Sequence, residues 1–207
     1  MPPIIIFVEG NIGTGKTTFL THAEKYKDIK IQVLYEPVEE WKKIGILGLF
    51  YSDPKKYAYL FQSYCLHTRF RQLGNIDKEA DLVLIERSIF CDKNVFACAC
   101  VEINYMNAIE MEIYNRWFDY YKDNIPYTHY HLYLRCDPLR SKSRIRQRSR
   151  EEEESITLTY LTLIHNKHEE WLNNNEKSVI IDANENLNDE DSVFKHVNRV
   201  YSIVTDK

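Results

Sequence analysis

The segment GNIGTGKT, from Gly10 to Thr17, contains residue types suited to binding phosphate groups. It fits the pattern G-x-x-x-x-G-K-[ST] and lies between an apolar run and a predicted helix. The glycines let the backbone turn tightly and direct N–H groups inward, and a helix beginning near Lys16 adds its positive end. Lys16 would neutralise the outer phosphates, and Thr17 would offer a hydroxyl to Mg²⁺. The sequence predicts a nucleoside triphosphate site formed by Gly10, Asn11, Ile12, Gly13, Thr14, Gly15, Lys16, Thr17 and Thr18.

Two other segments place charged residues directly after apolar runs. Glu36 follows the run IQVLY and precedes Pro37, which lacks a backbone donor and ends the strand. Glu86 and Arg87 follow the run LVLI in the same way. A carboxylate there can hold Mg²⁺ through water, and an arginine can bind developing phosphoryl charge. The alternatives are a helix N-cap for Glu36 and a surface ion pair for Glu86 and Arg87, but the phosphate-binding loop favours a catalytic site.

The apolar runs that precede these residues predict the strands of a parallel sheet. Five runs are nearly continuous, as expected when helices cover both faces of a sheet. They are Ile4–Val8, Ile31–Tyr35, Leu82–Glu86, His129–Leu134 and Ser178–Asp182. Between them, Lys55–Leu73 and Asn107–Asp123 carry apolar residues at helical spacing. Alternating strands and helices predict a doubly wound α/β fold, in which ligands bind at the carboxyl ends of the strands.

The composition indicates one domain without a nucleic-acid polymer as partner. The chain has 207 residues, of which 44% are hydrophobic and 28% are charged, and its formal net charge is −4. This size suits a single domain over residues 1–207 with a full core. The negative charge gives no basis for binding DNA or RNA. The sequence contains no run of about 18 apolar residues, so it predicts no membrane span.

The amino terminus and the cysteines favour a cytoplasmic location. The segment MPPIIIFVEG lacks a basic leader, and its apolar run is too short for a signal peptide with a cleavage site. The five cysteines lack zinc-binding spacing and are expected as small buried side chains in a reducing compartment. We therefore expect an intracellular protein without a targeting leader.

Seven motifs give the chain a resemblance to the deoxyribonucleoside kinase family. They are EGNIGTGKTTF, YEPVEEW, FQSYCLHTRFRQL, IERSIFCDKNVF, RIRQRSREEEE, LIHNKHEEWL and DANENL, in the family's order from residue 4 to about residue 190. The resemblance implies a P-loop kinase fold with a five-stranded parallel sheet, helices on both faces and an arginine-rich lid at about residues 140–155. It also implies ATP- and Mg²⁺-dependent phosphorylation of the 5′-hydroxyl of a deoxyribonucleoside, a reaction of nucleotide salvage.

The resemblance implies catalytic roles for the charged residues. Glu36 matches the general base that takes the proton from the 5′-hydroxyl, and a carboxylate at a strand tip facing the phosphates suits that role. Arg87 matches an arginine that approaches the 5′-oxygen and the phosphates. Lys16 would help to stabilise the charge that spreads during in-line transfer. Mg²⁺ would be held by Thr17 and Glu86.

The resemblance also implies a nucleoside pocket. Gln62 offers a donor and an acceptor to the edge of a base, and Tyr51 and Glu153 match positions that hold the sugar 3′-hydroxyl. For Phe61 and Phe96, packing in an ordinary core is the alternative to contact with the base. The complete set is Glu36, Trp41, Leu47, Tyr51, Phe61, Gln62, Arg69, Arg87, Asp92, Phe96 and Glu153.

Arg69 and Asp92 carry the expected base preference. In the family, an arginine and an aspartate at these places mark the branch that phosphorylates deoxycytidine, deoxyadenosine and deoxyguanosine, whereas thymidine-preferring members have apolar residues. A buried arginine–aspartate pair is costly unless both charges are satisfied, so its presence favours a positioned role against the base. We expect purine deoxynucleosides, deoxycytidine or both to be preferred over thymidine.

Three arginines and one loop are expected to bind ATP. Arg144 and Arg148 are four residues apart and would share a helical face, with Arg150 just beyond. Guanidinium groups suit polyphosphate because they donate parallel hydrogen bonds, and the alternative is a solvated charged helix. The adenine is expected to lie against a loop that contains Asp182, Ala183 and Asn184.

Two other functions and the assembly state stay open at this point. A nucleoside monophosphate kinase of the thymidylate kinase type would share the loop and the lid, but Glu36 would repel its acceptor phosphate. A non-catalytic, nucleotide-binding kinase-like subunit would be expected to have lost Lys16, Glu36 or Arg87, and all three are present. Family members are usually homodimers. The apolar segment Met111–Tyr121 is a candidate interface, although core packing explains it nearly as well.

Overall fold

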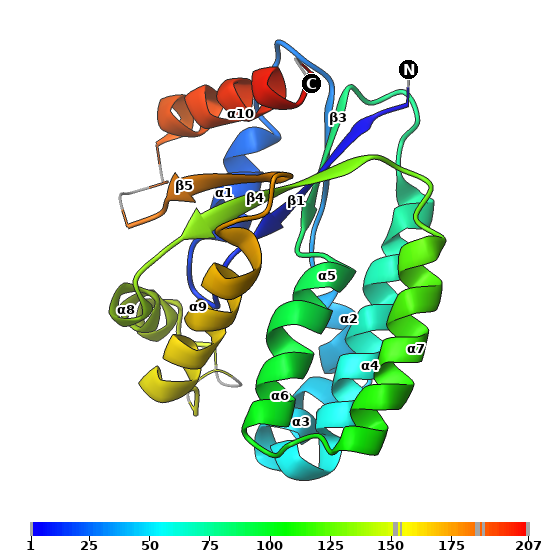
Figure 1. The fold of residues 1–207 in the computed structure, drawn as a ribbon. Helices are drawn as coiled ribbons and strands as arrows, with labels where there is room; N and C mark the ends of the chain where they lie inside the picture. The colour runs from blue at the N-terminus through cyan, green and yellow to red at the C-terminus, as the bar shows by residue number, and fades with distance from the viewer. Residues whose placement is uncertain (1, 151–152, 154, 185–186, 188, 206–207) are drawn as a thin grey trace.

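A five-stranded parallel sheet forms the centre of the molecule in the computed structural model, which describes residues 2–150, 153, 155–184, 187 and 189–205 (Figure 1). The strands are β1 (Ile4–Glu9), β2 (Ile31–Leu34), β3 (Leu82–Glu86), β4 (His129–Arg135) and β5 (Ser178–Asp182). Their order is β2-β3-β1-β4-β5, and every neighbouring pair is parallel. The predicted strands and the α/β fold are confirmed, and no strand end differs by more than one residue.

Alternate residues of the central strands pack against helices on opposite faces of the sheet. Val8 faces a core that includes side chains of α1 (Lys16–Ala23) and α10 (Glu190–Thr205). Phe7 faces a second cluster, against which Phe70 packs. Burial on both faces explains why the strands read as continuous apolar runs.

The other helices follow the strands in a layered arrangement. They are α2 (Val38–Lys43), α3 (Ile46–Ser52), α4 (Pro54–Gln72), α5 (Ile89–Cys91), α6 (Cys98–Glu102), α7 (Ala108–Asp123), α8 (Pro138–Arg148) and α9 (Leu158–Leu172), with the short helical segments η1 (Leu73–Asn75) and η2 (Asp92–Ala97). Figure 1 shows α4, α6 and α7 side by side. Among the described residues, no helix is long and apolar enough to cross a membrane.

Short polar residues determine where the long helices begin. Asp53 and Asp137 each precede a proline, and their carboxylates accept hydrogen bonds from backbone N–H groups of α4 and α8. Proline suits the first helical position because its missing N–H would be unpaired there. Asn107 and Glu110 form a capping box at the start of α7. The two helices predicted around residues 55–73 and 107–123 are therefore confirmed to within one residue at each end.

The register of the sheet brings charged residues from separate strands to one edge. Val8 pairs with Glu86 across β1 and β3, and Leu34 pairs with Ile85 across β2 and β3. The chain therefore leaves these three strands at nearly the same level. In an open α/β sheet, this edge is where ligands bind.

Candidate active site

A cavity of about 1500 Å³ lies at the carboxyl ends of β1, β2 and β3. It is larger than the roughly 300–1,000 Å³ that is typical of one small-molecule site. The predicted residues that line it are Ile12, Gly13, Thr14, Gly15, Lys16, Thr17, Thr18, Glu36, Trp41, Leu47, Tyr51, Phe61, Gln62, Arg69, Glu86, Arg87, Asp92, Phe96, Arg144, Arg148, Arg150, Glu153 and Asn184. Four others lie outside the lining and hydrogen-bond to residues within it: Gly10, Asn11, Asp182 and Ala183.

Glycines with left-handed backbone shape the phosphate-binding loop. Gly13 and Gly15 have φ values of 80° and 95°, which other residues adopt only with strain. A Cβ added at Gly13 would lie 2.6 Å from the Ser141 carbonyl oxygen and 2.8 Å from the Ile145 side chain, both in α8. The loop and the predicted lid helix therefore approach each other directly at Gly13, where only glycine fits.

Lys16 is a buried cation at the start of α1. Its ammonium group donates hydrogen bonds to the carbonyl oxygens of Asn11 (2.7 Å) and Gly10 (3.2 Å). Burial, reinforced by the charge of Arg87, lowers the pKa of Lys16 to about 7. The lysine is therefore held in place by loop carbonyls and is close to half-protonation at neutral pH.

Thr17 and Glu86 come together from α1 and β3. The Thr17 hydroxyl donates a hydrogen bond of 2.9 Å to a carboxylate oxygen of Glu86, and both residues line the cavity. A hydroxyl and a carboxylate are hard oxygen ligands, which Mg²⁺ prefers either directly or through water. These two side chains therefore fit the magnesium site expected from the sequence.

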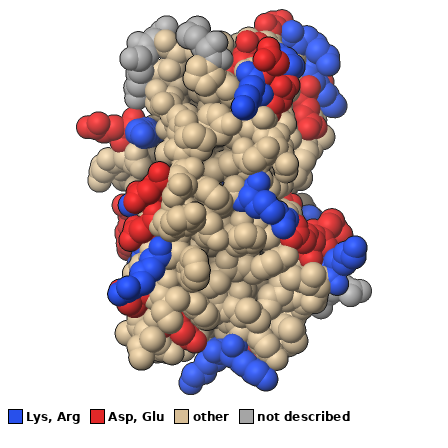
Figure 2. Space-filling view, turned by 90° about the vertical axis from the view of Figure 1, so that its right-hand side faces the viewer, with Lys and Arg blue, Asp and Glu red and all other residues tan. Residues whose placement is uncertain are grey.

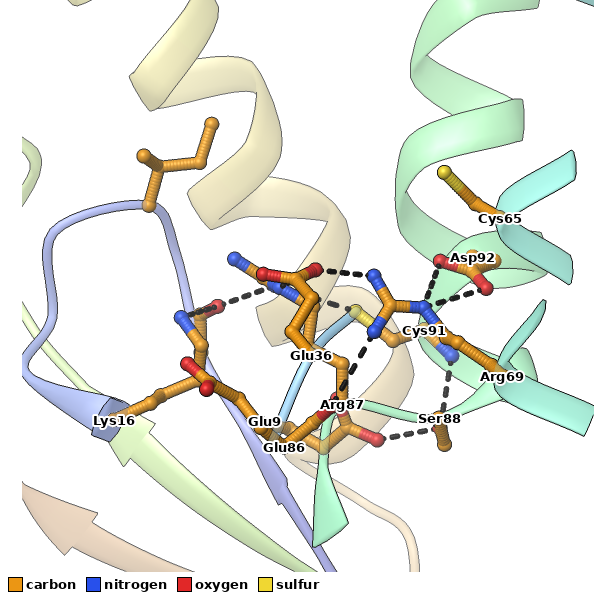
Figure 3. A network of polar contacts seen from close by, with 12 residues as sticks. Glu9, Lys16, Glu36, Cys65, Arg69, Glu86, Arg87, Ser88, Cys91 and Asp92 are labelled. Atoms are coloured by element: carbon orange, nitrogen blue, oxygen red, sulfur yellow. Dashed lines mark hydrogen bonds and ion pairs between the residues drawn. The ribbon is translucent and has the colours of Figure 1, made fainter. Parts of the chain in front are cut away.

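Four charged side chains, three of them buried and that of Glu36 largely so, meet in the cavity between the phosphate-binding loop and α4 (Figure 3). The Nε of Arg69 donates to both carboxylate oxygens of Asp92 at 2.9 Å, while its Nη2 donates to Glu36. The same Glu36 oxygen lies 3.4 Å from the Nε of Arg87. Glu36 is therefore held between two guanidinium groups, and Arg69 is held between two carboxylates.

The two carboxylates of this network titrate differently. Burial opposes ionisation of Glu36, but Arg69 and Arg87 outweigh burial and lower the pKa of Glu36 to about 2. Burial raises the pKa of Asp92 to about 6 despite its pairing with Arg69, and the negative charge of Glu36 adds to this rise. At neutral pH Glu36 is fully ionised and can accept a proton.

Arg87 adopts an unusual backbone conformation. Its φ is 64°, in the left-handed region, and this costs roughly 1–3 kcal/mol for a residue other than glycine. Its backbone N donates to the Val8 carbonyl oxygen at 3.0 Å, and its Nη1 donates to the Gly10 carbonyl oxygen at 2.8 Å. The guanidinium carbon lies 4.8 Å from the centre of the Phe96 ring. The strained turn directs this side chain towards Glu36 and the phosphate-binding loop.

Aromatic side chains line the cavity beside Arg69. The Arg69 guanidinium lies 5.2 Å from the Trp41 ring, and Phe61 packs edge-on against Trp41 at 5.6 Å and stacks on Phe50 at 4.8 Å. Gln62 is buried next to Phe61 on α4 and also lines the cavity. Phe61 belongs both to the apolar core and to the cavity lining, so the two interpretations of this residue are compatible.

Tyr51 and Glu153 both line the cavity, and the charge of the Glu153 carboxylate acts on the Tyr51 hydroxyl. Burial, reinforced by the Glu153 carboxylate, raises the pKa of the Tyr51 hydroxyl, which therefore stays protonated. Glu153 accepts a hydrogen bond from Arg148 and lies 3.5 Å from Nη1 of Arg150. One carboxylate thus connects two predicted lid arginines with the tyrosine.

Arg144 joins three parts of the site. Its Nη1 donates hydrogen bonds to the carbonyl oxygens of Thr14 at 3.1 Å and Ala183 at 2.9 Å. Thr14 belongs to the phosphate-binding loop, Ala183 follows β5, and Arg144 comes from α8. The lid helix is therefore tied to the loop and to the segment predicted to bind adenine.

The cavity also contains residues outside the predicted set. Cys65 lies on α4 three residues after Gln62 and four before Arg69, and Arg140 lies one turn before Arg144 on α8. Helical spacing could have identified both. The other lining residues are Tyr35, Val38, Glu39, Lys42, Asp137, Leu139, Ser143, Gln147 and Leu187.

A group of buried polar residues behind the cavity was not anticipated. Its members come from β1, the turn after β3, α5, β4 and α9, so no local motif joins them. They are Glu9, Ser88, Cys91, His131 and His168. Only the folded chain brings them together.

Comparison with known proteins identifies the family. The family model for deoxynucleoside kinases matches residues 6–205, which is nearly the whole chain. The chain belongs to the deoxynucleoside kinase family. The probable deoxycytidine kinase of fowlpox virus (strain NVSL) is 35% identical over 180 residues, which cover 83% of this chain and 73% of that protein. Deoxycytidine kinase of Rattus norvegicus is 32% identical over 200 residues, covering 81% and 74%. Mitochondrial thymidine kinase 2 of Homo sapiens is 34% identical over 177 residues, covering 81% and 64%.

This membership confirms the expected fold and reaction class. A deoxynucleoside kinase phosphorylates the 5′-hydroxyl of a deoxynucleoside, and the chain is an enzyme of this kind. The resemblance inferred from seven ordered motifs is confirmed, as is the P-loop kinase fold. A monophosphate kinase or a non-catalytic subunit is not favoured by the relatives of this deoxynucleoside kinase.

The low pKa of Lys16 predicts that this deoxynucleoside kinase takes up a proton when it binds ATP. Below about pH 7 the lysine is already charged, so binding does not change its protonation. Above that pH, the phosphates raise its pKa, and affinity should fall by up to about tenfold per pH unit. Calorimetry at pH 8 in two buffers with different ionisation enthalpies should show uptake of nearly one proton. Lys16→Arg, which stays charged, is the control, and equal uptake in both proteins would contradict the prediction.

Proposed function

We propose that the chain transfers the γ-phosphoryl group of ATP, in the presence of Mg²⁺, to the 5′-hydroxyl of a purine deoxynucleoside or deoxycytidine. The position of Glu36 is the observation that carries this proposal. Its carboxylate shares one cavity with the phosphate-binding loop and contacts Arg69 and Arg87. A candidate base, cationic groups and an aromatic pocket therefore lie within reach of one another.

Glu36 is the general base in this proposal. The 5′-hydroxyl, bound beside it, gives its proton to the carboxylate while its oxygen forms a bond to phosphorus. Because the pKa of Glu36 is about 2 before substrate binds, the carboxylate is a weak base and proton transfer occurs late. By then the hydroxyl has become acidic through its bond to phosphorus.

Positive charge around the transferring group comes from several elements. Lys16 neutralises the phosphates from the loop, and Arg87 approaches from the turn after β3. Thr17 and Glu86 would hold Mg²⁺, which would supply positive charge to neutralise the phosphate oxygens. The lid arginines that bind the polyphosphate are Arg144, Arg148 and Arg150, and the loop that cradles adenine contains Asp182, Ala183 and Asn184.

Tyr51 and Glu153 are proposed to bind the sugar. The raised pKa of Tyr51 keeps its hydroxyl as a hydrogen-bond donor, and Glu153 offers a carboxylate acceptor. A 3′-hydroxyl both accepts and donates, so this pair suits it. A tyrosine ring packed where the 2′-carbon lies leaves no room for the additional hydroxyl of ribose.

The Arg69–Asp92 pair supports a preference against thymidine. The relatives named as deoxycytidine kinases and the one named as a thymidine kinase are 32–35% identical to the chain, so the pocket residues must decide. Arg69 and Asp92 are both buried, hydrogen-bonded and in the cavity lining. Two fixed charges favour a base with exocyclic polar groups over the 5-methyl group of thymine. Gln62 completes the polar edge.

One face of α7 supports a homodimer. Four apolar side chains on it are exposed by 41–74%: Ile109, Ile113, Trp117 and Tyr120. Tyr114 and Phe118 of the same helix are buried, so the segment Met111–Tyr121 contributes to the core and also presents an apolar face. Few charged side chains interrupt the middle of the surface on the α7 side of the molecule (Figure 2). Such a face is suited to pairing with a second copy.

The proposed location is the cytoplasm. The five cysteines are free thiols, and four of them are buried. Free thiols persist in a reducing compartment, where ATP is also available as the phosphate donor.

Glu36→Gln should lower kcat at least about 100-fold, because the amide cannot accept the proton. Binding of deoxynucleoside should be retained, since the side chain keeps its size. Steady-state kinetics and calorimetric titration measure the two quantities separately. Glu39→Gln is the matched control because Glu39 lines the same cavity but its side chain is 90% exposed. An unchanged kcat in Glu36→Gln would remove Glu36 as the base.

Arg69→Met combined with Asp92→Ala should shift base preference towards thymidine. The ratio of kcat/KM for thymidine to that for deoxycytidine should rise by about tenfold or more, because apolar surface then replaces two charges. Initial rates with all four deoxynucleosides test this. Arg71→Met, an exposed arginine on the same helix, is the control. If the double variant keeps the original ranking, the proposed base preference is wrong.

Trp117→Glu should convert a dimer into a monomer, because it places a charge in the middle of the apolar face of α7. Sedimentation velocity over a range of protein concentrations measures the change. Arg116→Ala is the control, since Arg116 is exposed on the adjacent face of the helix. A wild-type protein that sediments as a monomer at all concentrations would refute the homodimer.

A further inference from the structure

Three consecutive residues at the end of β1 hold the turn that carries Arg87. The Val8 carbonyl accepts a hydrogen bond from the Arg87 backbone N at 3.0 Å, and the Gly10 carbonyl accepts one from Arg87 Nη1 at 2.8 Å. Between them, the Glu9 carboxylate accepts a hydrogen bond from the Ser88 hydroxyl at 2.5 Å. Of these three contacts, only that of Glu9 depends on a side chain of β1.

Glu9 is a fully buried charge. Its Oε1 lies 3.4 Å from Nδ1 of His131 in addition to its bond with Ser88, and its Oε2 has no hydrogen-bond partner among the described residues. Burial alone would raise the pKa of Glu9, but the hydrogen bonds with His131 and Ser88 keep it below its ordinary value. A half-satisfied buried carboxylate is unfavourable for stability, which makes a role beyond packing the better explanation.

Ser88 connects this carboxylate to the elements that line the cavity (Figure 3). Its hydroxyl accepts a hydrogen bond from the Cys91 backbone N at 3.1 Å and so caps α5. The single hydroxyl proton is then available to Glu9, which can only accept. The helical run that begins here continues through η2, which carries Asp92 and Phe96. Glu9 therefore anchors the Arg87 turn through Ser88, whereas Asp92 in the run that follows is held directly by Arg69.

We propose that Glu9 is a positioning residue for phosphoryl transfer: through Ser88 it fixes the left-handed turn at Arg87 and keeps the guanidinium between Gly10 and Glu36. The inference rests on the role proposed above for Arg87. A strained turn persists only where its surroundings hold it. Neither Glu9 nor Ser88 lines the cavity, so their loss should act on the chemical step and not on the contacts that bind substrate.

The magnitude expected for such a residue follows from geometry. A misplacement of about 1 Å in a group that acts on the reacting atoms can lower the rate about 100-fold. A pair that is purely structural would instead change the melting temperature while leaving kcat per folded molecule intact. Measuring kcat and KM on the folded fraction separates the two.

The experiment compares Glu9→Gln, Ser88→Ala, their combination and Ser88→Thr with the wild-type enzyme at saturating ATP. Glu9→Gln and Ser88→Ala should each lower kcat between roughly tenfold and 100-fold, with KM for the deoxynucleoside changed by less than about threefold. The double variant should be no worse than the more damaging single variant, because both act through one hydrogen bond. Ser88→Thr keeps the hydroxyl and should restore kcat. The control is Ser178→Ala. It removes a buried hydroxyl of β5 that has no hydrogen-bond partner among the described residues.

Arg87→Gln distinguishes failure of this inference from failure of the proposed function. If Arg87→Gln lowers kcat while Glu9→Gln and Ser88→Ala do not, Glu9 is only structural and the role of Arg87 stands. If Arg87→Gln leaves kcat unchanged, the proposed role of Arg87 fails and the positioning role fails with it. Effects of Glu9→Gln and Ser88→Ala that add fully would also overturn the inference. If Glu9→Gln does not fold, Ser88→Ala and its rescue by Ser88→Thr decide the question.

Discussion

The burial of charge at the ends of β2 and β3 is the constraint on which the site depends. Arg69, Arg87 and Asp92 are almost inaccessible to solvent, and Glu36 is largely buried with them. A buried ion costs several kcal/mol unless it is paired and hydrogen-bonded, so these groups must lie within a few ångströms of one another. Their pairing fixes the spacing between α4, η2 and two strand ends. A helix that shifted along the sheet would leave at least one of them unpaired.

The same pairing bears on how the proposed reaction redistributes charge. Glu36 holds its negative charge between Arg69 and Arg87 before transfer. When it takes the proton of the 5′-hydroxyl, it becomes neutral and its attraction for Arg87 falls. The field of that guanidinium then acts on the phosphoryl group, where negative charge is developing. Because the cationic groups are already in place, little reorganisation is needed during the step, and this is the condition under which electrostatic stabilisation is most effective.

Much of this arrangement could be predicted from sequence, because its signals are local. The phosphate-binding loop, the strands that end at Glu36 and Glu86, and the caps of α4 and α7 each lie within a short segment. Family motifs then grouped most residues of the cavity. What could not be predicted depends on packing between distant segments. The bond between Glu9 and Ser88 joins residues 79 positions apart, and the residues of α8 that Gly13 approaches are still more distant in sequence. Neither contact has a local pattern.

Two side chains behind Arg87, those of Cys91 and His168, leave the charge of its guanidinium group largely unscreened. Arg87 Nη1 lies 3.7 Å from the Cys91 sulfur, which lies 3.6 Å from Nε2 of His168. The Nδ1 of His168 lies 2.8 Å from the Ile164 carbonyl oxygen, which can only accept, so Nδ1 carries the proton and Nε2 accepts from the thiol. Burial lowers the pKa of His168 to about 3 and raises that of Cys91, so both groups are neutral. Neutral groups in the low-dielectric interior screen a charge poorly. Glu36 is the main countercharge of Arg87, and the buried carboxylate of Glu9 adds a smaller electrostatic contribution from beside the turn.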